Sequence, residues 1–170
     1  MTYPGAPGDP QLPTGAAGLP RDPIGPYDVS IHAVGSLIRN VNIVPSQSNT
    51  RNDKSVTHHE VTTWINELSV RAGVALWQYD RIPETHPARP GILTAISGAI
   101  ANGVASYVYA AAHPEMVSPA DGASYSQILW SRYTDGLEEI NTTITGVLAH
   151  GTGGAAWSFP RPQRSDREPF

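Results

Sequence analysis

Three consecutive residues carry the side chains of this sequence best suited to metal or acid–base chemistry: His58, His59 and Glu60. Imidazole and carboxylate groups are common protein ligands of zinc and iron. Two such ligands on one helix need positions i and i+4, but Thr62 and Thr63 stand four residues after the two histidines. The spacing therefore favours a structural role for the trio at the start of a helix over a metal site.

No other pattern in the sequence indicates catalysis. The paired histidines could still meet His86 or His113 in space, which leaves a His-dependent metalloenzyme open as an alternative. Glu138 and Glu139 are adjacent, so their side chains would point about 100° apart on a helix and lie on a solvated face. The run from Gly151 to Gly154 lacks the Gly-Lys-Ser/Thr ending of a phosphate loop. We therefore predict no enzyme activity, no catalytic residue, no cofactor and no metal.

An amphipathic helix positions the His-His-Glu trio and begins near Thr57. Thr57 and Glu60 have the Thr-x-x-Glu spacing of a capping box, and Val56 and Val61 stand where a hydrophobic staple would close over the first turn. Apolar residues then recur at steps of three and four, which predicts one buried face. The core positions predicted on this face are Val61, Trp64, Ile65 and Leu68.

Two more long helices are expected after this one. The first helix should end between Trp77 and Tyr79, because a proline-rich loop follows. The second is predicted from Gly91 to His113. The third begins near Ala123 and reaches a stop at Gly146 or Gly151. The predicted core positions on these two helices are Ile96, Ile100, Ile128, Leu129, Leu137 and Ile140.

Two glycines inside the second helix predict a close contact with another helix. Gly98 and Gly103 each cost about 1 kcal/mol relative to alanine in an exposed helix, so we expect a compensating close approach at both positions. A membrane-spanning helix would use the same small residues. Ser97 and Asn102 interrupt the apolar run, which favours a packed helix outside any membrane.

The segment before the first long helix predicts a short helix in residues 28–44, capped by Asp28 or Ser30. Its second half, around Val41 to Val44, alternates β-branched residues with Asn42, so a strand is the competing interpretation there. With the three long helices, this predicts an all-α fold: a small bundle of three long helices and one short N-terminal helix, spanning residues 28–149.

Extended arms are predicted at both ends. Residues 1–27 are rich in proline and glycine, with few side chains able to form a core. Residues 150–170 begin with a glycine hinge and continue as a docking arm. Trp64, Trp77 and Trp130 fall on or beside helices and are expected to pack in the core or at its rim, whereas an exposed tryptophan in the arm indicates an interface. The predicted interface residues of the arm are Trp157, Phe159, Arg161, Arg164 and Arg167.

Composition excludes several classes of protein. The chain of 170 residues has no cysteine, so disulfides, thiolate metal sites and thiol catalysis are not available to it. A net charge of −4 argues against a dedicated nucleic-acid binder, which would show a basic patch. The first residues lack the pattern of a signal peptide. These features predict synthesis in the cytoplasm.

The order of these features resembles a family, the head-to-tail connector or adaptor proteins of tailed bacteriophages. The resemblance covers residues 28–149. Its main motif is the helix pattern Thr-x-x-x-Val-x-x-x-Ile-x-x-x-Ser-x-x-Val. This sequence carries it at Thr57, Val61, Ile65 and Ser69, with a near-match for its last part at Ala72-Gly73-Val74. An alanine-rich helix follows, and then a helix with aromatic and leucine positions. The proline- and glycine-rich N-terminal arm departs from the family pattern.

The resemblance implies a structural protein of the virion neck. It implies a ring of the chain with itself, commonly of twelve subunits, between the portal protein and a tail-side neck protein. DNA would pass through the ring without specific binding, and no membrane would be involved. A small helical binding or regulatory protein, acting as a monomer or dimer, is the main alternative.

Overall fold

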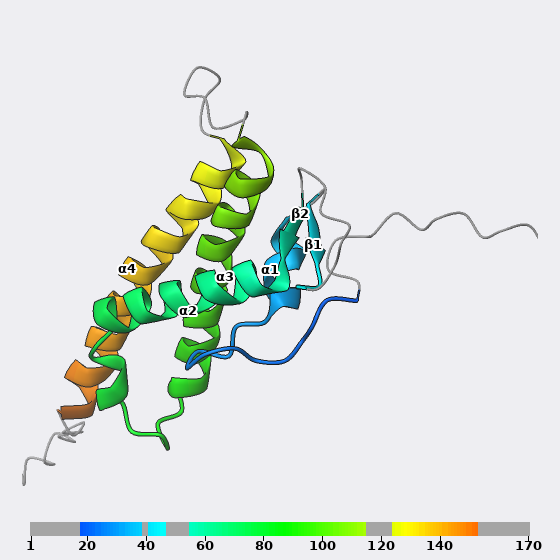
Figure 1. Ribbon diagram of the computed structural model, residues 1–170. Helices are drawn as coiled ribbons and strands as arrows, with labels where there is room; N and C mark the ends of the chain where they lie inside the picture. The colour runs from blue at the N-terminus through cyan, green and yellow to red at the C-terminus, as the bar shows by residue number, and fades with distance from the viewer. Residues whose placement is uncertain (1–17, 39–40, 47–54, 115–123, 153–170) are drawn as a thin grey trace, which may run out of the picture.

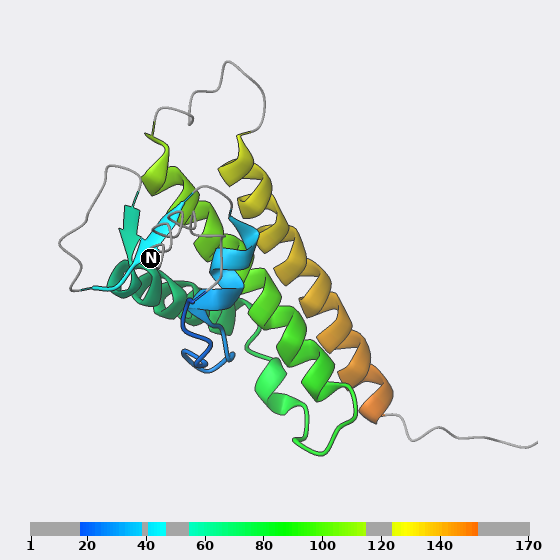
Figure 2. The same cartoon turned by 90° about the vertical axis from the view of Figure 1, so that its right-hand side faces the viewer.

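A computed structural model describes residues 18–38, 41–46, 55–114 and 124–152 of the chain. Its body is an antiparallel pair of long helices, α3 (Arg89–Ala112) and α4 (Tyr125–Thr152), which lie side by side in both views (Figures 1 and 2). Helix α2 (His58–Ala75) crosses this pair (Figure 1). The three long helices predicted from the sequence are therefore present.

Helix α2 begins at the residue that the sequence indicates. Thr57 is its N-cap, and Val56 and Val61 on either side of the first turn are both buried. The helix ends at Ala75, slightly earlier than expected, and the backbone N–H of Leu76 still bonds to the last turn. A short 3₁₀ turn, η1 (Tyr79–Arg81), then leads toward α3.

A two-stranded parallel sheet corrects the prediction of an all-α fold. Strand β1 (Asn42–Val44) pairs with β2 (Ser55–Thr57), with Ile43 opposite Val56. The alternating β-branched residues before Pro45 thus form a strand, and β2 leads directly into α2. The predicted short helix is present as α1 (Ile31–Leu37), whose N-cap Ser30 accepts a bond from the Ala33 N–H. The chain is mostly helical with a small sheet.

Residues 18–27, the described part of the predicted N-terminal arm, pack against the helices. A tight turn joins Ile24 to Val29 through an isolated antiparallel bridge. Gly25 in this turn has φ of 70°, a left-handed conformation that glycine adopts without steric cost. Tyr27 is buried, with its ring edge-on to Tyr79. The side chains of this segment therefore contribute to the core.

Helices α2, α3 and α4 meet at Gly103. A Cβ atom added there would lie 2.8 Å from Leu68 Cδ1 and 3.0 Å from Tyr133 Cγ, closer than ordinary carbon contacts. The expected close approach is thus confirmed at Gly103. At Gly98 it is wrong for the described part of the chain, because a Cβ added there would meet nothing within 4 Å.

Most of the predicted core residues are buried, with one clear exception. Trp64 and Leu137 are partly buried against the core. Ile128 is 40% exposed, so its assignment to the core is wrong. The buried stripe of α4 passes through Leu129 and Tyr133, and Ile128 lies about 100° around the helix from Leu129. The predicted positions that are buried are Val61, Ile65, Leu68, Ile96, Ile100, Leu129 and Ile140.

Helix α3 is the central helix of the body. By length and composition it could cross a membrane, but 56% of its most apolar window is buried inside the chain. The other three helices all contact it. A core helix of this kind meets the same criterion as a membrane helix, so the criterion gives only weak support for a membrane span.

Candidate functional site

The His-His-Glu trio forms the start of α2. The Glu60 carboxylate accepts bonds from both the backbone N–H and the hydroxyl of Thr57, each at 2.8 Å, and the Glu60 N–H donates to Thr57 Oγ1 at 3.2 Å. This reciprocal capping box satisfies amide groups that a helix start otherwise leaves open. The His59 backbone N–H donates to Ser46 Oγ at 3.1 Å. The predicted cap pair is confirmed, and its carboxylate is engaged in holding the helix.

The histidine side chains are dispersed. His58 is partly buried, and desolvation lowers its pKa below the usual value. His86 Nδ1 accepts a bond from the backbone N–H of Ala88 at 3.2 Å. His113 caps the end of α3 against the ring of Tyr109. Across residues 18–38, 41–46, 55–114 and 124–152, no three histidine or carboxylate side chains gather closely enough to hold a metal ion.

Four aromatic side chains from α2, α3 and α4 form one cluster, which we call the aromatic cluster. Tyr107 stacks on Trp130 with ring centroids 5.5 Å apart and planes at 11°, and Trp64 meets Tyr107 edge-on at 6.0 Å. Tyr133 lies 5.0 Å from Trp130, and burial raises its pKa. Such ring pairs stabilise by about 0.5–1.5 kcal/mol beyond their buried area. The cluster holds the three helices together.

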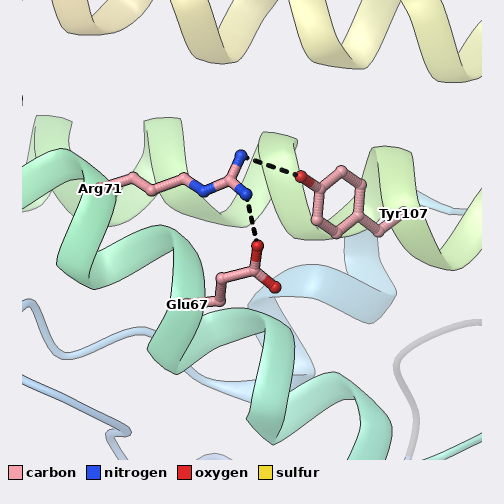
Figure 3. Close-up of polar contacts among 3 residues, drawn as sticks. All are labelled: Glu67, Arg71 and Tyr107. Atoms are coloured by element: carbon pink, nitrogen blue, oxygen red, sulfur yellow. Dashed lines mark hydrogen bonds and ion pairs between the residues drawn. The ribbon is translucent and has the colours of Figure 1, made fainter.

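An ion pair on α2 borders this cluster (Figure 3). Arg71 Nη2 lies 2.6 Å from Glu67 Oε1, one turn earlier on the same helix, and Arg71 Nη1 donates to the Tyr107 hydroxyl at 3.5 Å. The charged side chains are 55% and 42% exposed. Solvent therefore screens the pair, and its contribution to stability is small.

A groove of about 540 Å³ lies between α3 and α4, and we call it the α3–α4 groove. Its rim carries Arg132 and Glu139, one charge of each sign. Asn102 also lines it, and the Asn102 Oδ1 atom is buried without a hydrogen-bond partner in the described residues. The floor consists mainly of small and aliphatic side chains: Gly91, Ala95, Ala99, Gly136, Ile140 and Thr143.

Exposed apolar side chains lie near the C-terminal end of α2 and just beyond it, and we call this group the α2 ridge. Val70, Val74 and Trp77 are 69%, 74% and 61% exposed. The expectation that Trp77 packs in the core or at its rim is therefore wrong; its ring faces solvent, with the Arg81 guanidinium 5.9 Å from the ring centroid. Val70 and Val74 lie on a second face of α2, away from its buried stripe.

The predicted interface residues of the C-terminal arm, Trp157, Phe159, Arg161, Arg164 and Arg167, lie outside the described residues. The sequence analysis predicted neither the α2 ridge nor the α3–α4 groove. A signal for the ridge existed, because Val70 and Val74 are apolar but stand away from the predicted buried face of α2. The groove depends on how two helices pack, and no local pattern encodes it.

Searches against protein families, characterised proteins and solved structures find no match. The function must therefore be argued from the residues and the geometry.

Proposed function

We propose that this chain is a non-catalytic, structural subunit of a phage head-to-tail connector, in which copies of the chain form a ring between the portal protein and the tail. The ring commonly has twelve subunits in the family that the sequence resembles. In this proposal, the protein is made in the host cytoplasm and functions in the neck of the virion.

The α2 ridge is the observation that carries the proposal. A helical body this small should bury its large apolar side chains, yet Val70 and Val74, one turn apart on α2, and Trp77, just beyond its end, are exposed. Large apolar side chains exposed so close together along the chain favour contact with another molecule. The most enzyme-like residues, in contrast, are engaged in a helix cap through Thr57 and Glu60. Both features favour assembly over catalysis.

Charge supports a channel that lets DNA pass. The net charge of the chain is −4, and a ring multiplies it. Like charge on the wall of the channel would repel the phosphate backbone, so DNA would move through without adhering. Tight, salt-sensitive binding of duplex DNA by the isolated protein would contradict this part of the proposal.

Two measurements test the proposal on the full chain. Electron microscopy of the purified protein, alone and with portal protein, should show rings. A chain truncated after Thr152 should keep its helix content by circular dichroism but fail to join heads to tails. A protein that stays monomeric or dimeric with the portal present would favour a small binding protein instead, and normal virion assembly by the truncated chain would exclude a docking role for the arm.

A further inference from the structure

We propose that the α2 ridge of one copy of this chain docks in the α3–α4 groove of the next copy. This inference rests on the proposed function, because it specifies the contact that repeats around the ring. It commits to a second copy of the chain as the occupant of the groove.

The orientation of α2 prevents the ridge from filling the groove of its own chain. Leu68 marks the side of α2 that faces α3 and α4, because it packs where Gly103 and Tyr133 meet. Val70 is separated from Leu68 by about 160° around the helix, and Val74 by about 120°. The ridge therefore points away from its own α3–α4 pair, and a ridge that fills this groove must come from another molecule.

The two surfaces agree in length. The helical part of the ridge runs from Val70 to Val74, about 6 Å at 1.5 Å per residue, and Trp77 follows just beyond the end of α2. The groove runs from Gly91 to Asn102 along α3, about 16 Å by the same measure. The helical part of the ridge thus fits within a groove of about three turns and leaves room for Trp77. Small side chains on the groove floor, such as Ala95, allow a partner helix to approach closely.

The two surfaces also agree in chemistry. The ridge offers two valines and an indole ring to a mainly small and aliphatic floor. At the edges, Arg132 and Glu139 on the groove face a ridge flanked by Arg81 and its neighbour Asp80, so each surface offers both signs of charge.

The ridge and the groove are different surfaces, so each copy can use its ridge on one neighbour and its groove on the other. Such contacts repeat until the rotation closes a ring. A two-fold dimer could use the same two surfaces reciprocally, with each ridge in the partner's groove. The number of copies in the assembly therefore decides between a ring and a dimer built on this contact.

Cysteine crosslinking tests the contact directly, because the chain has no cysteine of its own. One variant carries Val74→Cys on the ridge, and a second carries Ala95→Cys on the groove floor. Both positions are exposed, so neither change should disturb the fold. The two full-length proteins are mixed at high concentration and treated with a short bifunctional maleimide, and mass spectrometry identifies the crosslinked pairs. We expect mixed pairs that join position 74 of one copy to position 95 of another.

A matched control uses Glu138→Cys, an exposed position on the side of α4 turned away from the groove. Mixed with Val74→Cys, it should crosslink at least tenfold less. Efficient pairing of Val74→Cys with itself would overturn the proposal, because it would indicate contact between two ridges. Equal crosslinking at Glu138→Cys would also overturn it.

Electron microscopy of the same samples separates this inference from the proposed function. Rings without crosslinks between positions 74 and 95 would refute the ridge–groove contact and leave the ring intact. Crosslinked copies that form only dimers or open chains would support the contact and count against the connector function. If neither rings nor crosslinks form, both are wrong. As a second variant, Ala95→Trp should fill the groove and prevent ring assembly without changing helix content.

Discussion

Replacing Gly103 by alanine should destabilise the fold, although alanine is the better helix former. The new methyl carbon would lie 2.8 Å from Leu68 Cδ1 and about 3 Å from two ring carbons of Tyr133. Leu68 is fully buried and Tyr133 nearly so, which leaves little room for either side chain to move aside. The added methyl group therefore pushes α2 and α4 away from α3 at the point where glycine lets the three helices meet.

The magnitude follows from two opposing terms. Alanine stabilises a helix interior by about 1 kcal/mol relative to glycine. Overpacking of a well-packed core costs about 1–3 kcal/mol. The net change for Gly103→Ala is a loss of about 0–2 kcal/mol in the free energy of unfolding. The control Gly98→Ala has the same helix term and no neighbour within 4 Å, so it should gain up to about 1 kcal/mol.

The difference between the two variants is the decisive quantity, because the helix term cancels in it. Urea unfolding followed by circular dichroism at about 222 nm gives both free energies at a dilution where the chain is unassembled. We expect Gly103→Ala to be less stable than Gly98→Ala by about 1–3 kcal/mol. If the two variants are equally stable, the helices do not meet at Gly103 as described, and the argument is refuted.

Three smaller predictions concern α2. Thr57→Ala removes the capping box and should cost about 1 kcal/mol in urea unfolding, whereas the exposed Thr63→Ala should cost almost nothing. Arg71→Ala breaks the pair with Glu67 and should change stability by less than about 0.5 kcal/mol, because solvent screens the partly exposed charges. A larger loss would show that the pair stabilises the fold more than a solvent-screened ion pair should. Burial lowers the pKa of His58, so the unfolded chain binds a proton at this imidazole more readily than the folded chain does. The stability of the fold should therefore fall as the pH drops through about 6.5, and it should fall less in His58→Gln. Thermal melting at a series of pH values measures both effects.

The start of α2 could be predicted because the information is local. Thr57 and Glu60 satisfy open amide groups of the first turn, and Val56 and Val61 close over it, all within one turn of chain. The parallel pairing of β1 with β2, in contrast, could not be predicted from local sequence. It joins strands of three residues each, separated along the chain by a polar segment. Strands so short give little periodicity, and their pairing depends on contacts distant in sequence.

Errors in the predicted core arose where a helix has more apolar positions than its buried face can accept. Helical spacing shows that α4 has an apolar stripe, but both Ile128 and Leu129 are compatible with it. The side on which α3 lies decides between them, and it buries Leu129. The exposure of Trp77 has a different origin, because it stands just beyond the end of α2, where the chain turns and helical spacing no longer applies. Periodicity thus predicts that a face exists, while tertiary packing decides which residues share it.

Two of the three glycines of α3, Gly98 and Gly103, join the stability of the chain to its proposed assembly. The cost of Gly103 is offset inside the chain, where Leu68 fills the space. Gly98 has no such neighbour in the described residues; it stands about one turn from Ala95 and Asn102, which line the α3–α4 groove, and is itself beside the groove. If a second copy docks there, its close approach offsets the cost of Gly98. The ring contact therefore predicts opposite effects for Gly98→Ala: the isolated chain becomes more stable, but rings form only at higher protein concentration. Mass photometry across a dilution series measures the second effect, and unchanged ring formation would place the contact elsewhere.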